Sequence, residues 1–277
     1  MASDRSPAHG FPRWVLAPAV LATILLGLPV LGLLTGVEWT RWWSLVTSDS
    51  ARTALGLSLR TALASTVLSA LCGVPLAVLL AHTRSRFGEL LRTVVLLPLV
   101  LPPVVSGLAL LTTFGRRGLV GEHLDALGID IAFTTVAVVL AQTFVAMPFL
   151  VLTLEGALRS RDVGLEESAA TLGARPTAVL ARITLPLAAP AIRAGTVLAF
   201  ARALGEFGAT LTFAGSFPGV TRTIPLEVYL QREVDPAAAV AVSTLLVAAA
   251  VAIVAIVYGR GSSAGAPLGS EPCQQRG

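Results

Sequence analysis

Residues 131–154 read IAFTTVAVVLAQTFVAMPFLVLTL, and none of these 24 residues is Asp, Glu, Arg or Lys. An α-helix of about 20 residues crosses the hydrocarbon core of a bilayer, which is roughly 30 Å thick. The stretch therefore predicts a membrane-spanning helix, and the chain contains other stretches like it.

Runs of the same kind recur from one end of the chain to the other. They predict six membrane-spanning helices, at residues 14–37, 61–81, 93–115, 131–154, 194–214 and 236–259. The fifth run is apolar except for Arg202 and Glu206. The first run exceeds the 7–15 apolar residues or so of a cleavable signal peptide, so we expect it to be a permanent anchor.

The overall composition agrees with a membrane protein and excludes most other classes. Hydrophobic residues make up 55% of the 277-residue chain, charged residues make up 13%, and the mean hydropathy is +0.80. A soluble domain carries about 25% charged residues. An ordinary cytosolic enzyme, a disordered chain and a fibrous protein are therefore excluded, and we expect an all-α integral membrane protein.

The basic residues predict the orientation of the chain. All 20 are Arg. If the N-terminus is cytoplasmic, 12 of them fall in inside segments and 6 in outside loops, which favours both termini inside. Residues 1–13 are then a cytoplasmic N-terminal segment, and the Gly-, Ser- and Pro-rich residues 260–277 a disordered cytoplasmic tail. The scattered Arg residues do not form the basic stripe typical of nucleic-acid binding, and no Cys/His spacing indicates a metal site.

The longest inside loop, residues 155–193, carries a helix-turn-helix pattern. Residues 161–172 resemble a short amphipathic helix, with apolar residues at positions 163, 165, 169, 170 and 172 and acids in the first turns, where the helix dipole favours them. Gly173 stands where a left-handed residue would end that helix, and Pro176 suits the start of a second helix. We expect Pro186 and Pro190 to break the chain before the fifth span.

This loop resembles the EAA loop of ATP-binding-cassette importer permeases. Glu167-Ser168-Ala169 is followed after three residues by Gly173, and after nine more by Ile183-x-Leu185-Pro186. The one departure from the family pattern is Ser168, which replaces an alanine. The wider resemblance is to the molybdate branch of the binding-protein-dependent permeases, through residues 97–105 (LPLVLPPVV), 115–118 (GRRG), 141–149 (AQTFVAMPF) and 201–210 (ARALGEFGAT). The sulfate/thiosulfate permeases share much of the Gly-Glu-Phe-Gly segment and are the second candidate.

The resemblance implies a type I importer permease of six transmembrane helices in a bacterial plasma (inner) membrane. Its expected partners are a second copy of the chain, two cytoplasmic ATP-binding-cassette subunits, an external substrate-binding protein and an oxyanion substrate. The chain has no Lys and so no phosphate-binding Gly-Lys loop, and ATP and Mg are expected on the partner ATPase. No catalytic residue is expected in this chain. The residues implied to couple to the ATPase are Glu166, Glu167, Ser168, Ala169, Gly173, Ile183, Leu185 and Pro186.

A few polar residues and prolines within the spans are candidates for the transport pathway or its gate. Arg202 and Glu206 are four residues apart, so we expect an ion pair on one helix face that Thr210 continues. This face either lines the pathway or clamps helices together. Arg60 either attracts an anion or extends to the membrane surface. Pro102 and Pro103 bend the third span, as part of a gate or as a static kink.

Two other function classes compete with the importer permease. A stand-alone secondary transporter would need an ion site at the middle of the membrane, and the sequence offers a single charged pair there. A membrane-embedded enzyme would need a clustered nucleophile, base or metal set, which the sequence does not show. Residue chemistry does not distinguish molybdate from tungstate, and sulfate is disfavoured by resemblance alone.

Overall fold

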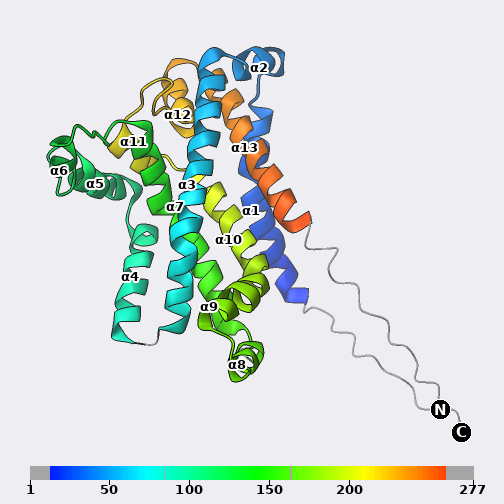
Figure 1. Cartoon of the computed structure of the whole chain (residues 1–277). Helices are drawn as coiled ribbons and strands as arrows, with labels where there is room; N and C mark the ends of the chain where they lie inside the picture. The colour runs from blue at the N-terminus through cyan, green and yellow to red at the C-terminus, as the bar shows by residue number, and fades with distance from the viewer. Residues whose placement is uncertain (1–12, 84, 163, 260–277) are drawn as a thin grey trace, which may run out of the picture.

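The chain is almost entirely helical in the computed structural model, which describes residues 13–83, 85–162 and 164–259 (Figure 1). The two terminal segments predicted from the sequence lie outside the described residues, apart from Arg13. The elements in chain order are η1 (Arg13–Val15), α1 (Leu16–Thr35), α2 (Trp39–Val46), α3 (Asp49–His82), α4 (Arg86–Val100), α5 (Pro103–Phe114), α6 (Gly121–Asp125), α7 (Thr135–Ser160), α8 (Gly164–Thr171), α9 (Pro176–Val179), the π-helix η2 (Leu180–Thr184), α10 (Leu185–Leu204), α11 (Gly208–Ala214), α12 (Ile224–Val234) and α13 (Pro236–Gly259).

Five helical stretches in the described part of the chain are long and apolar enough to cross a membrane. They are α1, α3, α7, the continuous stretch Pro176–Leu204, and α13 as far as Ile253. A sixth crossing results if α4 and α5, which are bent by 118° at their junction, count together as one span.

The third predicted span, residues 93–115, is bent, as its prolines predict, and the bend divides it into two helices. The chain bends by 118° between α4 and α5, with Leu101 and Pro102 at the break. Both residues have extended backbone angles, and Pro103 starts α5. Consecutive prolines remove two backbone donors and exclude the preceding residues from the helical conformation, so the bend is larger than a kink.

The fifth predicted span, residues 194–214, is not one continuous helix. The long helix ends at Leu204, and Gly205 caps it by donating its N–H to the Ala201 carbonyl. A separate short helix, α11, follows. The helical stretch that is long and apolar enough to contain the fifth crossing therefore begins earlier, within Pro176–Leu204.

The expected break at Pro186 and Pro190 does not occur, because both prolines lie within α10. The π-helix η2 directly precedes them, and the Leu185 N–H donates to the Leu180 carbonyl five residues back. A π-helix shifts the hydrogen-bond register, and η2 ends at Thr184, two residues before Pro186, which has no N–H to donate. Both proline side chains lie exposed, so their rings do not displace a packed neighbour.

The centre of the bundle is formed by α3, α7 and α10, which pack through small residues. Ala62, Ala146 and Ala199 belong to one fully buried cluster. A Cβ atom at Gly195 would lie 3.1 Å from the Leu150 Cα atom, so α10 and α7 approach closely. Small residues at such contacts let helix backbones come together where hydrophobic burial offers no gain over lipid.

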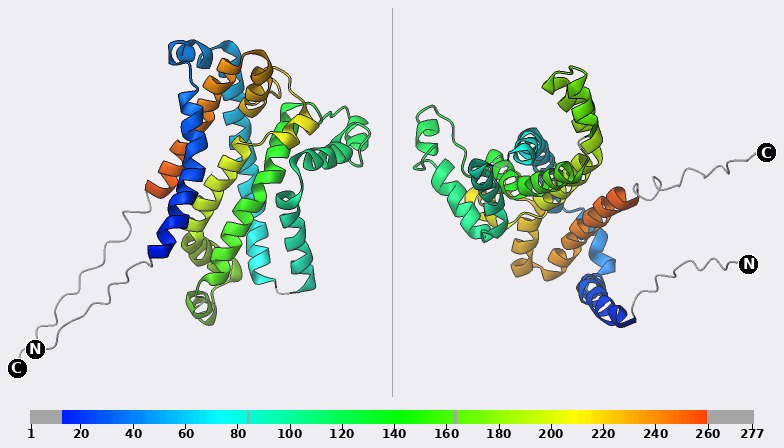
Figure 2. Two further views of the ribbon diagram at one scale, coloured as in Figure 1. Left: turned by 180° about the vertical axis from the view of Figure 1, so that it is seen from behind. Right: turned by 90° about the horizontal axis from the view of Figure 1, so that it is seen from below.

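The remaining helices surround this centre in an asymmetric way. α1 and α13 lie side by side at one edge, and α4, α5 and α6 lie at the other (Figures 1 and 2). α1 has no buried residue and exposes many leucines, which suits contact with lipid. α8 and α9 project from one end of the bundle, and α2 and α12 lie at the opposite end (Figure 1).

Candidate functional site

The projecting hairpin has the local geometry that its sequence predicts, with a shorter first helix. α8 covers Gly164–Thr171 rather than residues 161–172. Gly173 has a φ angle of +85°, a left-handed conformation that side chains rarely adopt. Its N–H donates to the Ala170 carbonyl at 2.9 Å, and Pro176 starts α9.

The hairpin presents an apolar surface beside exposed polar residues. Leu165 and Leu172 are 62% and 87% exposed, and a groove of about 380 Å³ lies between Leu165, Arg182, Ile183, Pro186 and Leu187. Of the residues implied by the EAA-like motif, Glu167, Ser168, Gly173 and Pro186 are exposed, and Ala169, Ile183 and Leu185 are half-buried. Exposed leucines beside a groove are suited to contact with another protein.

Glu166 differs from its neighbour Glu167 because its carboxylate faces the protein. Arg161 Nη2 lies 2.5 Å from Glu166 Oε1, and the Thr184 hydroxyl donates to the same oxygen. Arg161 Nη1 also donates to the Thr184 carbonyl at 3.5 Å. Glu166 therefore connects the end of α7, the start of α8 and η2.

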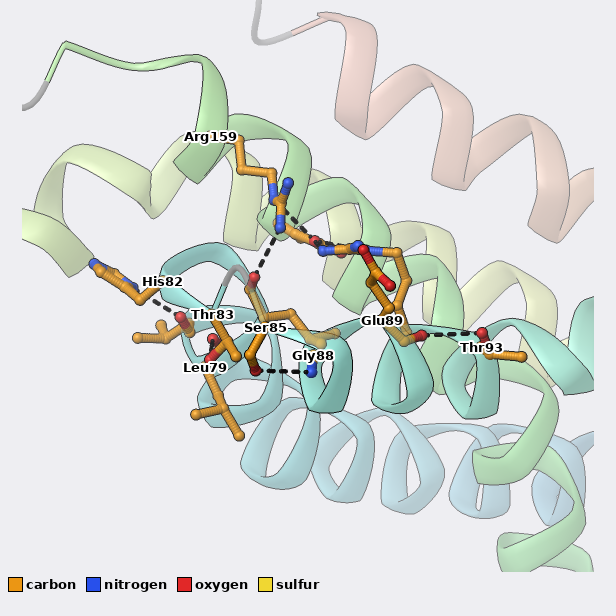
Figure 3. A network of polar contacts seen from close by, with 12 residues as sticks. Leu79, His82, Thr83, Ser85, Gly88, Glu89, Thr93 and Arg159 are labelled. Atoms are coloured by element: carbon orange, nitrogen blue, oxygen red, sulfur yellow. Dashed lines mark hydrogen bonds and ion pairs between the residues drawn. The ribbon is translucent and has the colours of Figure 1, made fainter.

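A second charged cluster lies at the same end of the bundle, around the buried Glu155. Its Oε1 atom accepts from Arg92 Nε at 3.0 Å and Nη2 at 2.5 Å, and Arg159 Nε lies 3.0 Å away. Arg159 also donates from Nη2 to the Leu80 carbonyl at 3.0 Å. Figure 3 shows Arg159 pointing toward the turn between α3 and α4, where the Ser85 hydroxyl caps Gly88. The cluster therefore holds the ends of α3, α4 and α7 together.

The break between α4 and α5 is held against α11. A Cβ atom at Gly208 would lie 2.6 Å from the Pro103 Cβ atom, and one at Gly107 would lie 2.7 Å from the Ala209 carbonyl oxygen. These approaches are closer than side chains permit, so both glycines are required for the crossing. Pro103 is thereby brought next to α11, the helix that contains Thr210.

Arg202 and Glu206 form the expected ion pair, with 2.7 Å between Arg202 Nη2 and Glu206 Oε2. The expectation of one continuous helix face is wrong, because α10 ends at Leu204 and Thr210 lies on α11. Glu206 Oε1 accepts the Ala209 N–H at 2.9 Å and so caps the start of α11. The pair therefore stabilises a break between two helices.

Buried polar side chains accompany this junction. Ser106, Gln142 and Thr210 are at most 1% exposed, and their side-chain polar atoms have no hydrogen-bond partner among the described residues. They come from α5, α7 and α11, and α11 packs against the other two. A buried polar group without a partner costs free energy, so such a group needs a water, a ligand or a rearrangement to satisfy it.

Arg60 and Arg116 stand apart from these clusters. Arg60 is exposed on α3, beside Leu63, Val67 and Leu71 in a shallow groove of about 510 Å³. Among the described residues no ion pair to Arg60 is found. Arg116 pairs with Asp130 at 2.6 Å, and its hydrogen bond holds the pKa of that carboxyl below its usual value.

The sequence did not point to Glu155, Arg92, Ser106 or Gln142. A signal existed for the first pair, because Glu155 ends an apolar run and Arg159 follows four residues later. For Ser106 and Gln142 the signal was a polar residue within an apolar run, which does not say which side of the helix is buried. Over residues 13–83, 85–162 and 164–259 no group of three or more His, Cys, Asp or Glu side chains could hold a metal ion.

Comparison with known proteins places these features in a family. Residues 73–260 match the model of the binding-protein-dependent transport system inner membrane component. A molybdenum transport system permease protein of Mycobacterium bovis is 56% identical over 265 residues, covering 96% of this chain and 98% of the relative.

Solved structures agree on the fold. A bacterial ABC transporter that imports alginate matches with a TM-score of 0.66 at 21% identity, covering 91% of this chain and 96% of the other. The same kind of transporter in complex with a pentasaccharide-bound periplasmic protein matches with a TM-score of 0.64 at 21% identity, covering 91% and 94%.

Proposed function

Because the chain belongs to the family of binding-protein-dependent transport system inner membrane components, we propose that it is the membrane permease of an ATP-driven molybdate importer. It is a multi-pass membrane protein, and it forms the pathway through which the substrate crosses. The observation that carries this conclusion is the 56% identity to a molybdenum permease over 98% of that relative's length.

The work of ATP hydrolysis belongs to a separate subunit. The chain has no Lys, so it lacks the phosphate-binding Gly-Lys loop, and ATP and Mg bind to the partner ATPase. The hairpin of α8 and α9 is the surface that this subunit contacts. Two copies of the chain pair in the membrane, two ATPase subunits bind beneath them, and an external binding protein delivers the oxyanion. The complex of the alginate transporter with a periplasmic protein supports the last assignment.

The hairpin end of the bundle faces the cytoplasm, and α2 and α12 face the exterior. The excess of Arg in the inside segments supports this orientation, with both termini in the cytoplasm of a bacterial inner membrane. The hairpin then lies where a soluble ATPase can reach it.

Movement of the ATPase subunits reaches the pathway through rigid elements. Closure of the ATPase displaces the hairpin, and α10 (Leu185–Leu204) transmits this displacement along the bundle. At its far end lie the Arg202–Glu206 pair and the crossing of α5 over α11. This junction is the proposed gate, with Pro102, Pro103 and Thr210 at or beside it.

Uptake into vesicles tests the function and its specificity. The chain is reconstituted with its ATPase and binding protein, and uptake of radiolabelled molybdate, tungstate and sulfate is measured with and without ATP. We expect ATP-dependent uptake of molybdate. Uptake of sulfate alone would overturn the substrate, and uptake of molybdate without the ATPase would favour a secondary transporter.

A further inference from the structure

The two adjacent acids of α8 have different surroundings. The Glu167 side chain is exposed, and among the described residues no hydrogen bond or ion pair involves its carboxylate. The Glu166 side chain is only 15% exposed and faces Arg161, whose side chain is 16% exposed. Neighbouring positions on a helix point about 100° apart, so one acid can face the bundle while the other faces outward.

We propose that Glu166 is a positioning residue that fixes the coupling helix α8 to the start of α10, while the exposed Glu167 contacts the ATPase. The proposal rests on the proposed function of the hairpin and divides it between two side chains. Glu166 transmits the movement, and Glu167 contributes to docking.

The contacts of Glu166 are those of a three-way link. Its Oε1 atom receives Arg161 Nη2 at 2.5 Å and the hydroxyl of Thr184. Arg161 is the residue that directly follows α7 and caps its end, and Thr184 is the last residue of η2. Arg161 Nη1 donates to the Thr184 carbonyl at 3.5 Å, so the guanidinium contacts both partners. Charge-assisted bonds in a partly buried site are stronger than exposed ones, because water competes less.

The position of Thr184 determines which helix the Glu166 contacts join to α8. Thr184 is 3% exposed and directly precedes α10, the helix that packs on α7 through Gly195 and ends at the Arg202–Glu206 junction. The chain between α8 and α10 contains the Gly173 turn and the π-helix η2. Such irregular elements are places where a helical connection can yield. The Glu166 link bypasses them, so that α8 and α10 move together.

The test compares four variants of the reconstituted complex. ATP hydrolysis, molybdate uptake and retention of the ATPase on a size-exclusion column are measured for Glu166→Gln, Arg161→Gln, Thr184→Val and the matched control Glu167→Gln. We expect the first three to retain the ATPase and hydrolyse ATP, with molybdate transported per ATP reduced by on the order of tenfold for Glu166→Gln. Glu167→Gln should weaken retention of the ATPase instead.

Some outcomes of this experiment would overturn the proposal, and one would support it. An unchanged ratio of molybdate to ATP in Glu166→Gln would show that the link does not transmit movement. Loss of the ATPase from that variant would place Glu166 in the docking contact. Because Thr184→Val keeps both charges, a reduced ratio in this variant as well would identify the link itself as the cause. If wild-type complexes transport nothing, the proposed function fails, whereas wild-type transport with indistinguishable variants refutes the link alone.

Discussion

Replacement of Gly107 by alanine should separate α5 from α11. The added Cβ atom would lie 2.7 Å from both the Ala209 carbonyl oxygen and the Thr212 Cβ atom, whereas ordinary contacts begin near 3.4 Å. The nearest of these atoms belongs to the backbone, so it cannot rotate away. Overpacking of this kind costs about 1–3 kcal/mol.

The same substitution also changes helix propensity, and a second glycine isolates this effect. Alanine favours a helix over glycine by about 1 kcal/mol. Gly156 lies on an exposed position of α7, and a Cβ atom there would have nothing within 4 Å. The difference between Gly107→Ala and Gly156→Ala therefore measures the steric effect alone.

The assay is thermal unfolding of the purified protein in detergent micelles, followed by tryptophan fluorescence. For a chain of this size a change of 1 kcal/mol moves the midpoint by about 2 °C, so Gly107→Ala should unfold about 2–6 °C below Gly156→Ala. Equal midpoints, or a higher midpoint for Gly107→Ala, would refute the close crossing of α5 and α11.

Four further substitutions at three positions test the polar clusters by the same unfolding assay, combined with uptake. Glu155→Gln leaves two guanidinium groups facing a neutral amide, so it should destabilise the protein by about 1–3 kcal/mol after allowance for the partial exposure of Arg92 and Arg159; an unchanged midpoint would contradict a clamp. Glu206→Ala removes the cap of α11 and also leaves Arg202 without its partner, so it should destabilise the protein by more than the roughly 1 kcal/mol of a lost cap and should reduce uptake, whereas Glu206→Gln keeps an acceptor and should unfold between the alanine variant and wild type. Gln142→Leu removes a buried amide that has no hydrogen-bond partner in the described part of the chain and should raise the midpoint; a lower midpoint would show that the amide is satisfied by a water or a ligand.

The sequence predicted the class of fold because length and hydropathy decide it. Uncharged runs anticipated helices close to α1 and α13, since nothing else in those runs competes with a helix. The bend at Pro102 and Pro103 was also expected, but its angle of 118° was not. That angle depends on the packing of Pro103 against Gly208, two residues far apart in the chain.

The predictions that were wrong concern positions where the local sequence allows a helix either to continue or to end, and tertiary contacts decide between the two. The run at residues 194–214 has no charge pattern that marks Gly205 as a helix end, and the break forms because Glu206 caps the next helix. Pro186 was expected to end the helix because it has no N–H to donate, but the π-helix η2 precedes it and the chain stays helical. The sequence assigned both Glu166 and Glu167 to coupling, and its motif singled out Glu167. The contacts of Glu166 with Arg161 and Thr184 could not be predicted from it, because they depend on the folded positions of η2 and the end of α7.

The buried acids constrain how an oxyanion can pass. Three carboxylates are buried in the described part of the chain, Glu155, Glu206 and Glu227, and each is paired with at least one arginine. An unpaired carboxylate in a low-dielectric interior would repel a dianion strongly, and the pairing removes this net charge. The same pairing engages the arginines, so they offer the anion less attraction than a free guanidinium would. Under the proposed function, hydroxyl and amide groups such as those of Thr210 and Gln142 are candidates to contact the anion, and neutral donors bind a dianion more weakly than a free guanidinium does. The proposed function accordingly assigns tight recognition of molybdate to the external binding protein.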